Sequence, residues 1–457
     1  MSFINLHEML DATHVEERSL AEDRGKSEIR FGDLTTDAPF RAGLEYTPPA
    51  RGTWTIAHTP MLVPGSMEIF VCPDGCLRGV VLSAAEFDGL DRFAMVTVKE
   101  NNLYDNNMES LFIDGVTDIL NHRETLPTTV FLYNSCIHKM LAVDMNYIYR
   151  ELRKRFPSVH FVESSMDCTM RKSKVNYEEA CNRQLYAALD PCPIDDRSVN
   201  IIGNYFPLQQ DSELLKMLTT YGYTVRDINR VKTWKEYQKM ASSAVEIYNH
   251  PLARLAADTL ADRLGTTAVY APYCWDYDSI DNALNDVANV TGTDTPDTLQ
   301  LRADTDACLN ALQEKIGGYE IQIDAAATPR PLELAKLLIC HDFHVSAVYA
   351  DAVSPEEAEA RDWLKDNVPD LKLRSIVNFR GRVNPRNEAE EDGGKLLAIG
   401  QKAAYFTGTK HFVNLIYQSG LWGYAGIQEL CRLMEEACAT EQDAKEIIQV
   451  KAWGCHG

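Results

Sequence analysis

Short apolar runs alternate with stretches of helical periodicity along most of the chain. Each run is bounded by polar or turn residues, which is the pattern of a buried strand. Strands are predicted at residues 67–72, 93–98, 129–133, 160–162, 198–203, 244–248, 267–270, 319–323, 344–349, 373–377 and 403–406. Helices are predicted at residues 109–122, 138–156, 211–221, 251–264 and 331–340, and from about residue 424. This alternation predicts parallel sheets with helices on both faces, an α/β fold.

Helix-start signals support two further helices. Thr233 and Glu236 have the spacing of a capping box, in which each side chain accepts a backbone N–H of the first turn. Ser354, Pro355 and Glu357 repeat that pattern, with proline at the first helical position. Both segments are therefore expected to open helices.

The length of 457 residues exceeds one ordinary core and favours several domains. Three doubly wound units account for the strands better than one large sheet does. The expected division is an N-terminal arm at 1–40, then units at 41–197, 198–318 and 319–457. The arm is expected to be irregular because the first forty residues are rich in charge.

Composition narrows the possible functions. The net charge of −22 argues against nucleic acid as a partner, since phosphate binding needs a basic face. No apolar stretch is long enough to cross a membrane, and no secretion signal is visible, so the cytoplasm is the expected location. Neither a P-loop nor a dinucleotide-binding glycine motif occurs, so any redox chemistry must use a metal cluster or a partner.

Two cysteine loops carry the clearest chemical signal. Cys72-Pro73-Asp74-Gly75-Cys76 and Ser135-Cys136 each follow a predicted strand and precede a segment able to begin a helix. A thiol at such a junction faces unpaired backbone N–H groups and the positive end of the helix dipole, which favour thiolate. Cysteine thiolates are the usual ligands of iron–sulfur clusters. The alternative is that these cysteines are buried structural thiols, a common fate for cysteine.

Four stretches of the chain resemble one family. The loop ending in Gly75-Cys76 and the Ser135-Cys136 pair resemble its cluster-ligand loops. The segment VNIIGNY, residues 199–205, resembles the strand that opens its second domain, and LWGYAGI, residues 421–427, resembles its turn into the last helix. The chain thus resembles the nitrogenase component 1 superfamily.

That resemblance implies three Rossmann-like domains around a central cleft and an iron–sulfur cluster, 4Fe–4S or larger. It implies a homodimer or a heterotetramer with a homologous subunit, the cluster lying at the subunit interface. A separate ATP-hydrolysing iron protein would supply electrons. The ligands would be Cys76, Cys136 and, as a third thiolate, Cys72. The family has a further cysteine before the Gly-Cys loop, but residues 1–71 contain none, so Glu45 or Asp74 is a possible oxygen ligand.

Nitrogenase also anchors its active-site cofactor through a cysteine after a mid-chain strand. The corresponding stretch here, Tyr248-Asn249-His250-Pro251, has no thiol. This predicts a nitrogenase-like reductase acting on another substrate. An assembly scaffold that carries a metallocofactor without turnover is the alternative, and a cluster-free α/β binding protein is a third.

Other polar residues follow predicted strands, where open α/β sheets bind ligands. His250 and Cys274 are candidates to line the cleft, although His250 beside Pro251 also fits an ordinary helix start. Cys168, beside Arg171 and Lys172, fits either an anion site or a plain loop.

Overall fold

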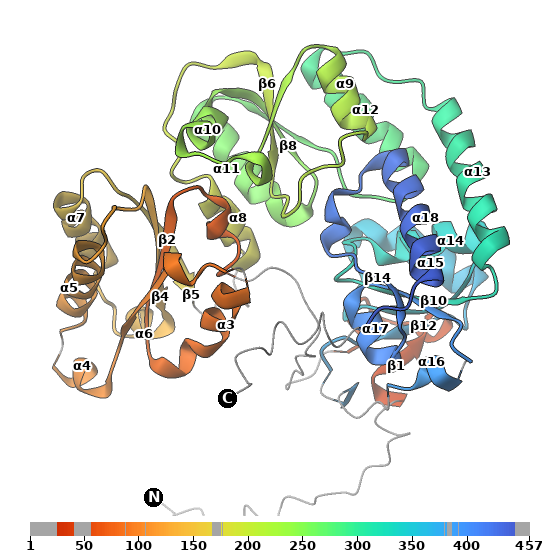
Figure 1. Cartoon of the computed structure of the whole chain (residues 1–457), viewed down its shortest axis with the longest axis horizontal. Coiled ribbons are helices and arrows are strands. Elements are labelled where there is room, and N and C mark those ends of the chain that lie inside the picture. The colour runs from red at the N-terminus through yellow and green to blue at the C-terminus, as the bar shows by residue number, and fades with distance from the viewer. Residues whose placement is uncertain are drawn as a thin grey trace, which may run out of the picture.

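The computed structural model describes residues 25–40, 56–86, 88–105, 107–166, 175, 177–378, 380–381, 386–391 and 393–443. Three sheets organise these residues into three lobes (Figure 1). The first and third lobes lie at opposite ends of the molecule, with the second lobe between them. Within the described residues, no helix has the length and apolar character needed to cross a membrane. The predicted α/β class with parallel sheets is confirmed.

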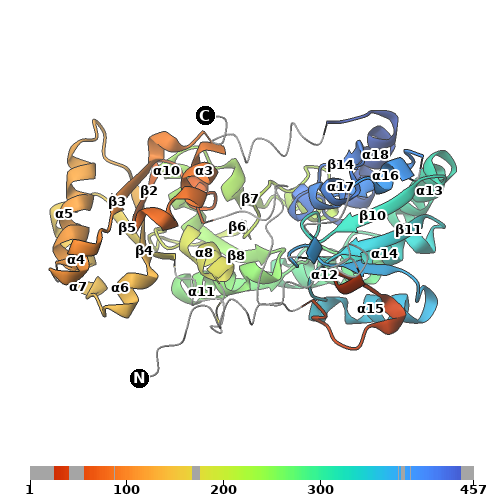
Figure 2. The same ribbon diagram turned by 90° about the horizontal axis from the view of Figure 1, so that it is seen from below.

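The first sheet has strand order β3-β2-β4-β5, and its strands are parallel. The strands are β2 (Ser66–Cys72), β3 (Phe93–Thr97), β4 (Thr129–Ser135) and β5 (His160–Met166). The helices of this lobe are α3 (Arg78–Glu86), α4 (Glu100–Tyr104), α5 (Met108–Asn121), α6 (Cys136–Met140), α7 (Met145–Arg155) and α8 (Tyr177–Leu185). Figure 2 shows α5 and α7 on the opposite side of the sheet from α8. Alternate residues of β2 therefore enter two separate apolar layers. Ile69 and Val71 pack in the layer that contains α5 and α7, whereas Phe70 and Cys72 pack in the layer that contains α8.

The second sheet has order β7-β6-β8-β9 and is also parallel. Its strands are β6 (Asp195–Ile202), β7 (Thr224–Asp227), β8 (Ser243–Tyr248) and β9 (Thr267–Tyr270). Its helices are α9 (Glu213–Thr220), α10 (Trp234–Lys239), α11 (Arg254–Leu264) and α12 (Tyr277–Thr291), and α13 (Leu299–Ile316) leads to the third lobe. The capping box predicted at Thr233 is confirmed, because its hydroxyl accepts the Glu236 N–H at 3.2 Å and the Glu236 carboxylate accepts the Thr233 N–H at 3.1 Å.

The third sheet has order β1-β12-β11-β10-β13-β14. Its strands are β1 (Glu28–Arg30), β10 (Glu320–Asp324), β11 (His344–Tyr349), β12 (Lys372–Arg374), β13 (Leu396–Ile399) and β14 (His411–Val413). Its helices are α14 (Pro331–Cys340), α15 (Ala358–Asn367), α16 (Glu388–Glu391), α17 (Gln401–Thr407) and α18 (Gly423–Ala439). β1 pairs antiparallel with β12, so part of the expected N-terminal arm belongs to this sheet.

The strand predicted at residues 403–406 is wrong, because this segment is helix α17. The adjacent strand, β13, had no prediction. A carboxylate from strand β10 caps helix α17. Asp324 accepts the Ala403 N–H at 2.8 Å and so satisfies a backbone donor in the first turn of α17. Gly400 precedes this turn with φ 110° and lies so close to Asp324 that a Cβ atom there would collide with it.

The second predicted capping box is also wrong in part. Ser354 Oγ does accept the Glu356 N–H, at 3.3 Å. Glu357, however, accepts the N–H groups of Leu332 and Glu333 at 2.6 and 3.2 Å, so it caps the neighbouring helix α14. Burial raises the pKa of Glu357 to about 8, although these two hydrogen bonds favour the charged carboxylate and act to lower it.

The helix predicted at residues 138–156 is two helices. α6 ends at Met140, Ala142 has a left-handed backbone with φ 52°, and the Asp144 carboxylate accepts the Tyr147 N–H to begin α7. The break keeps α6 short, immediately after the second cysteine loop.

Candidate functional site

The two cysteine loops lie at the same edge of the first sheet. β2 and β4 are adjacent parallel strands, with Phe70 opposite Tyr133. Extending this register by two residues places Cys72 level with Ser135, and Cys136 follows directly. Figure 1 shows α3 and α6, which follow the two loops, near the lower edge of the first lobe. Carboxyl ends of parallel strands are where open α/β sheets bind ligands.

Cys76 and Cys136 are the accessible thiols of this edge. Cys76 is exposed at the end of a 3-10 turn, Asp74–Cys76, and Cys136 is partly exposed as the first residue of α6. The Thr97 hydroxyl donates to Asp74 at 3.0 Å and thereby ties the first loop to the end of β3. Glu45 and Cys168 lie outside the described residues.

Cys72 differs from the other two thiols. Its side chain is fully buried in the apolar layer that contains Phe70 and Tyr133, whose rings stack at 4.3 Å. Burial, with a smaller contribution from Cys76 and Asp74, raises the pKa of Cys72 to about 12. In the absence of a metal, this thiol therefore stays protonated, contrary to the expectation that its position favours thiolate.

His138 fixes the start of the second loop's helix, a role that sequence reasoning missed. The Ser135 N–H donates to His138 Nδ1 at 3.1 Å, and the imidazole is buried edge-on against Phe112 with ring centroids 5.2 Å apart. Burial lowers the pKa of His138, so the ring is neutral and can accept this bond. The Ser-x-x-His spacing after a strand is the signal that could have identified it.

Glu68 is a second buried residue of the first lobe that sequence reasoning missed. The only sign of it in the sequence is an acidic residue within the apolar run of β2. Glu68, on β2, is fully buried, and neither carboxylate oxygen has a hydrogen-bond partner in the described part of the chain. Burial raises its pKa well above the ordinary value, and Arg92 only partly opposes the shift. Burial thus favours the protonated form of Glu68 inside the first lobe.

The cysteine donor set fits an iron–sulfur cluster in its chemistry. Cysteine thiolates are the ligands that such clusters take, and two of the three thiols are at least partly exposed. Within the described residues, no three His, Cys, Asp or Glu side chains are already grouped to hold a metal ion. The edge thus offers the right atoms without a complete set of preformed ligands.

His250 and Cys274 lie at the junction of the second and third lobes. The Leu252 N–H donates to His250 Nδ1 at 3.1 Å, so His250 acts as a helix cap. Burial, reinforced by the positive charge of Arg330, lowers the pKa of His250 to about 4. The ring is therefore neutral with its proton on Nε2, and it meets Tyr417 edge-on at 5.6 Å.

Cys274 is buried, and burial raises the pKa of its thiol above the ordinary range. The next residue, Trp275, joins the two lobes: its N–H donates to Glu333 at 3.1 Å and its indole Nε1 donates to Thr328 at 2.9 Å. Sequence reasoning placed His250 and Cys274 near one crevice, and the charge of Arg330 acts on both groups.

Arg330 is the centre of this junction and was not predicted. Its guanidinium donates to Glu333 at 2.6 Å and to Glu356 at 2.8 Å, and Tyr270 of β9 also donates to Glu356 at 2.8 Å. Burial raises the pKa of Glu333, and Arg330 opposes that shift. This network, buried at Arg330 and Glu333 and more exposed at Glu356, connects strand β9 of the second sheet to helix α14 of the third lobe.

A strained turn closes the same junction. Tyr417, Gln418 and Ser419 all have left-handed backbone, with φ of 47°, 61° and 47°, which is costly for residues with a Cβ atom. The turn is held from the third lobe: Ala326 and Ala327 carbonyls accept the N–H groups of Tyr417 and Gln418 at 2.9 and 2.6 Å. Strain of this kind is concentrated at functional sites.

Comparisons with known proteins agree with this architecture. The family model for nitrogenase component 1 type oxidoreductases matches residues 113–438. Two solved structures titled nitrogenase Cp1 resemble the chain at 12% identity. The structure at pH 6.5 has a TM-score of 0.63 and covers 89% of this chain and 95% of its own. The structure at pH 5 has a TM-score of 0.57 and covers 99% of each. No curated protein sequence matches the chain.

Proposed function

This chain belongs to the nitrogenase component 1 type oxidoreductase family, and we propose that it is the catalytic component of a nitrogenase-like reductase. In this proposal an ATP-hydrolysing iron-protein partner delivers electrons, by way of an iron–sulfur cluster, to a substrate or metallocofactor between the lobes. The membership itself supports a general oxidoreductase.

The observation that carries the proposal is the position of the three cysteines at one edge of two adjacent strands. Cys76 and Cys136 would bind the cluster as accessible thiolates, and Cys72 would be the third ligand. Metal coordination deprotonates a thiol outright, so the high pKa of free Cys72 does not prevent ligation, although it makes binding release a proton. A cluster held there would supply one-electron transfer.

The chain's own residues position these thiols and exclude water. Asp74 and Thr97 hold the first loop, while Ser135 and His138 fix the second. The buried layer around Cys72 keeps water from the inner side of the edge. These contacts set the local polarity around the sulfurs, which is the main way in which a protein adjusts a cluster's potential.

Substrate would be placed at the junction of the second and third lobes, lined by His250 and Cys274. His250 presents an N–H from Nε2 as a hydrogen-bond donor, since its Nδ1 is occupied by Leu252. The stretch Tyr248–Pro251 has no thiol to anchor a nitrogenase cofactor. We therefore propose a substrate other than that of nitrogenase.

Exposed apolar residues support a homologous partner subunit. Met140 and Leu141, just after Cys136, are 80% and 48% exposed, and Tyr104 at the end of α4 is 86% exposed. Large exposed apolar side chains of this kind typify protein interfaces. A homodimer or a heterotetramer in the cytoplasm would cover them and share the cluster between subunits.

An assembly scaffold that passes a metallocofactor on without turnover is the second candidate. The exposure of Cys76 favours it, since a carried group must be able to leave.

The two candidates differ in their response to the partner. Anaerobically purified protein would be mixed with its iron-protein homologue and MgATP while cluster absorbance and EPR are recorded. ATP-dependent reduction of the cluster, followed by reoxidation on adding substrate extracts, is expected for the reductase. Transfer of iron to an apo-protein acceptor, with no ATP-dependent reduction, would contradict the reductase and support the scaffold.

A further inference from the structure

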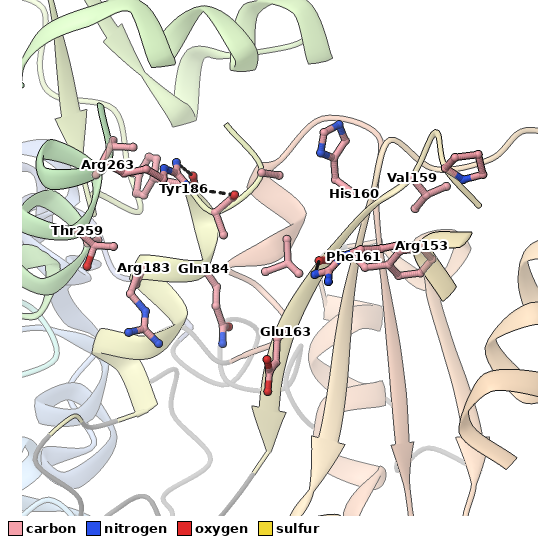
Figure 3. A pocket seen from close by; sticks show the side chains of 16 residues that line it. Arg153, Val159, His160, Phe161, Glu163, Arg183, Gln184, Tyr186, Thr259 and Arg263 are labelled. Carbon is pink, nitrogen blue, oxygen red and sulfur yellow. Dashed lines mark hydrogen bonds between the residues drawn. The ribbon is translucent and has the colours of Figure 1, made fainter. Parts of the chain in front are cut away.

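A cavity of about 650 Å³ opens beside β5, away from both groups of residues described above. Its walls are the outer edge of β5 on one side and helices α8 and α11 on the other, with Arg153 of α7 reaching in (Figure 3). β5 is the last strand of the first sheet, so within the described part of the chain one side of its backbone has no neighbouring strand.

The backbone on that side of β5 is available for pairing. The His160 N–H donates to the carbonyl of Thr128, the residue just before β4, at 3.0 Å, so it points toward β4. In a strand, successive residues direct their N–H and C=O groups to opposite sides, so those of Phe161 and Glu163 point away from β4. The only hydrogen bond recorded there among the described residues is a long one of 3.4 Å, from Arg153 to the Phe161 carbonyl. Unpaired groups of this kind form a template for another strand.

The charge of the cavity contrasts with that of the protein. The net charge of the chain is −22, yet the lining contains Arg153, Arg183 and Arg263, and Glu163 is its one acidic residue. His160 also lines it, 4.0 Å from Asp190. Such a basic site in an acidic protein attracts an anionic ligand selectively.

The arginines differ in what they already bind. Arg263 donates to the carbonyls of Ala187 and Tyr186 at 3.0 and 2.6 Å, and Arg153 lies over the Tyr149 ring at 5.4 Å. Arg183 is exposed and makes no side-chain hydrogen bond or ion pair with any residue the structure describes. Its guanidinium is therefore available to bind a carboxylate.

We propose that this cavity binds an extended acidic peptide segment of a partner protein, which adds as a strand to the open edge of β5 and places carboxylates against Arg183 and its neighbours. Main-chain bonds to β5 would supply the affinity, and the arginines would select acidic side chains. An unpaired strand edge beside a basic cavity favours a peptide over a small anion, because a small anion makes no use of a row of backbone groups. The proposal is independent of the cluster and of the reductase function.

The test uses the purified full chain and a fluorescent seven-residue peptide of alternating valine and glutamate, with binding followed by anisotropy. Saturable binding is expected, and Arg183→Glu should weaken it by at least about tenfold. Arg150→Glu is the matched control, since Arg150 is on α7 but does not line the cavity. Binding that is absent, or equally strong in Arg183→Glu, would overturn the proposal.

A second pair of variants tests strand addition itself. Glu163→Pro removes one outward N–H at an edge position where proline is tolerated, and Glu163→Ala keeps that N–H. Only the proline variant should lose affinity, with circular dichroism and melting confirming that both are folded. Glutarate competing as well as the peptide, or a peptide N-methylated at alternate amides binding unchanged, would identify a small-anion site and refute strand addition.

Discussion

The edge of the first sheet and the junction of the second and third lobes are both polar clusters at strand ends, but they differ in completeness. At the junction, Arg330 has two carboxylate partners and Trp275 has two acceptors. At the cysteine edge, Cys76 is exposed, and no three possible ligand side chains of the described residues are grouped to hold a metal.

This contrast indicates what each region needs from outside the chain. At the junction Arg330 is paired with carboxylates of the chain itself, so we expect this region chiefly to stabilise the fold. At the cysteine edge the Cys76 thiol is exposed and the Cys136 thiol is partly exposed, as expected of a site that a cluster and a second subunit would complete. Variants at the junction should change stability, and variants at the edge should change iron content.

The largest effect is expected from breaking the junction. Arg330→Met leaves Glu333 buried without its cation, which should lower the free energy of unfolding by about 3–5 kcal/mol. Arg254→Met is the control, because its ion pair with Asp258 is exposed and is worth less than about 1 kcal/mol. Urea denaturation measures both, and equal losses would show that the junction does not hold the lobes together. Iron content should stay unchanged in Arg330→Met.

An intermediate effect is expected from His250 on acidification. Its pKa is about 4 in the folded protein, below the ordinary value of about 6.5. Between these values the unfolded chain binds the proton and the folded chain does not, so stability falls as pH drops from about 6.5 to about 4, by at most about 3 kcal/mol.

His250→Asn keeps an oxygen to cap the helix and removes this titration. Denaturation at pH 7 and pH 4.5 should show a smaller acid-induced loss for His250→Asn than for the wild type. His250→Ser, a second cap that does not titrate, should behave in the same way. If all three proteins lose the same stability, His250 is not held neutral at the junction.

The smallest change in stability is expected at Cys72, which lies at the cysteine edge but has a fully buried side chain. Cys72→Ala should cost about 1 kcal/mol of unfolding free energy, as expected for loss of a buried thiol, and should also lower iron content. Cys431→Ala, which removes a buried thiol on α18, should match the stability loss and retain full iron. Equal iron in the two variants would exclude Cys72 as a ligand.

The parts of the fold that depend on local pattern could be predicted from the sequence. The strands of the three sheets are mostly apolar runs, and α14 and β11 have the predicted bounds, Pro331–Cys340 and His344–Tyr349. The segment 403–406 was mistaken for a strand because its cap, Asp324, comes from a distant part of the chain. Local periodicity cannot include such a contact.

The same limit applies to the sites. The two cysteine loops at the edge of the first sheet could be predicted, since their position directly after apolar runs is visible in the sequence alone. Arg330 and the left-handed turn at Gln418 could not be predicted, because their roles arise only where two lobes meet. The cavity beside β5 likewise depends on helices α8 and α11 being placed against an edge strand.

If the proposed function is right, the cysteine edge holds an iron–sulfur cluster. Iron and acid-labile sulfide would be measured on anaerobically purified wild type and on Cys76→Ser/Cys136→Ser, with EPR after dithionite reduction. We expect iron, sulfide and a reduced-cluster signal in the wild type, and their loss in a double variant that remains folded. Wild-type protein without iron after reconstitution, or a double variant with full iron, would contradict it.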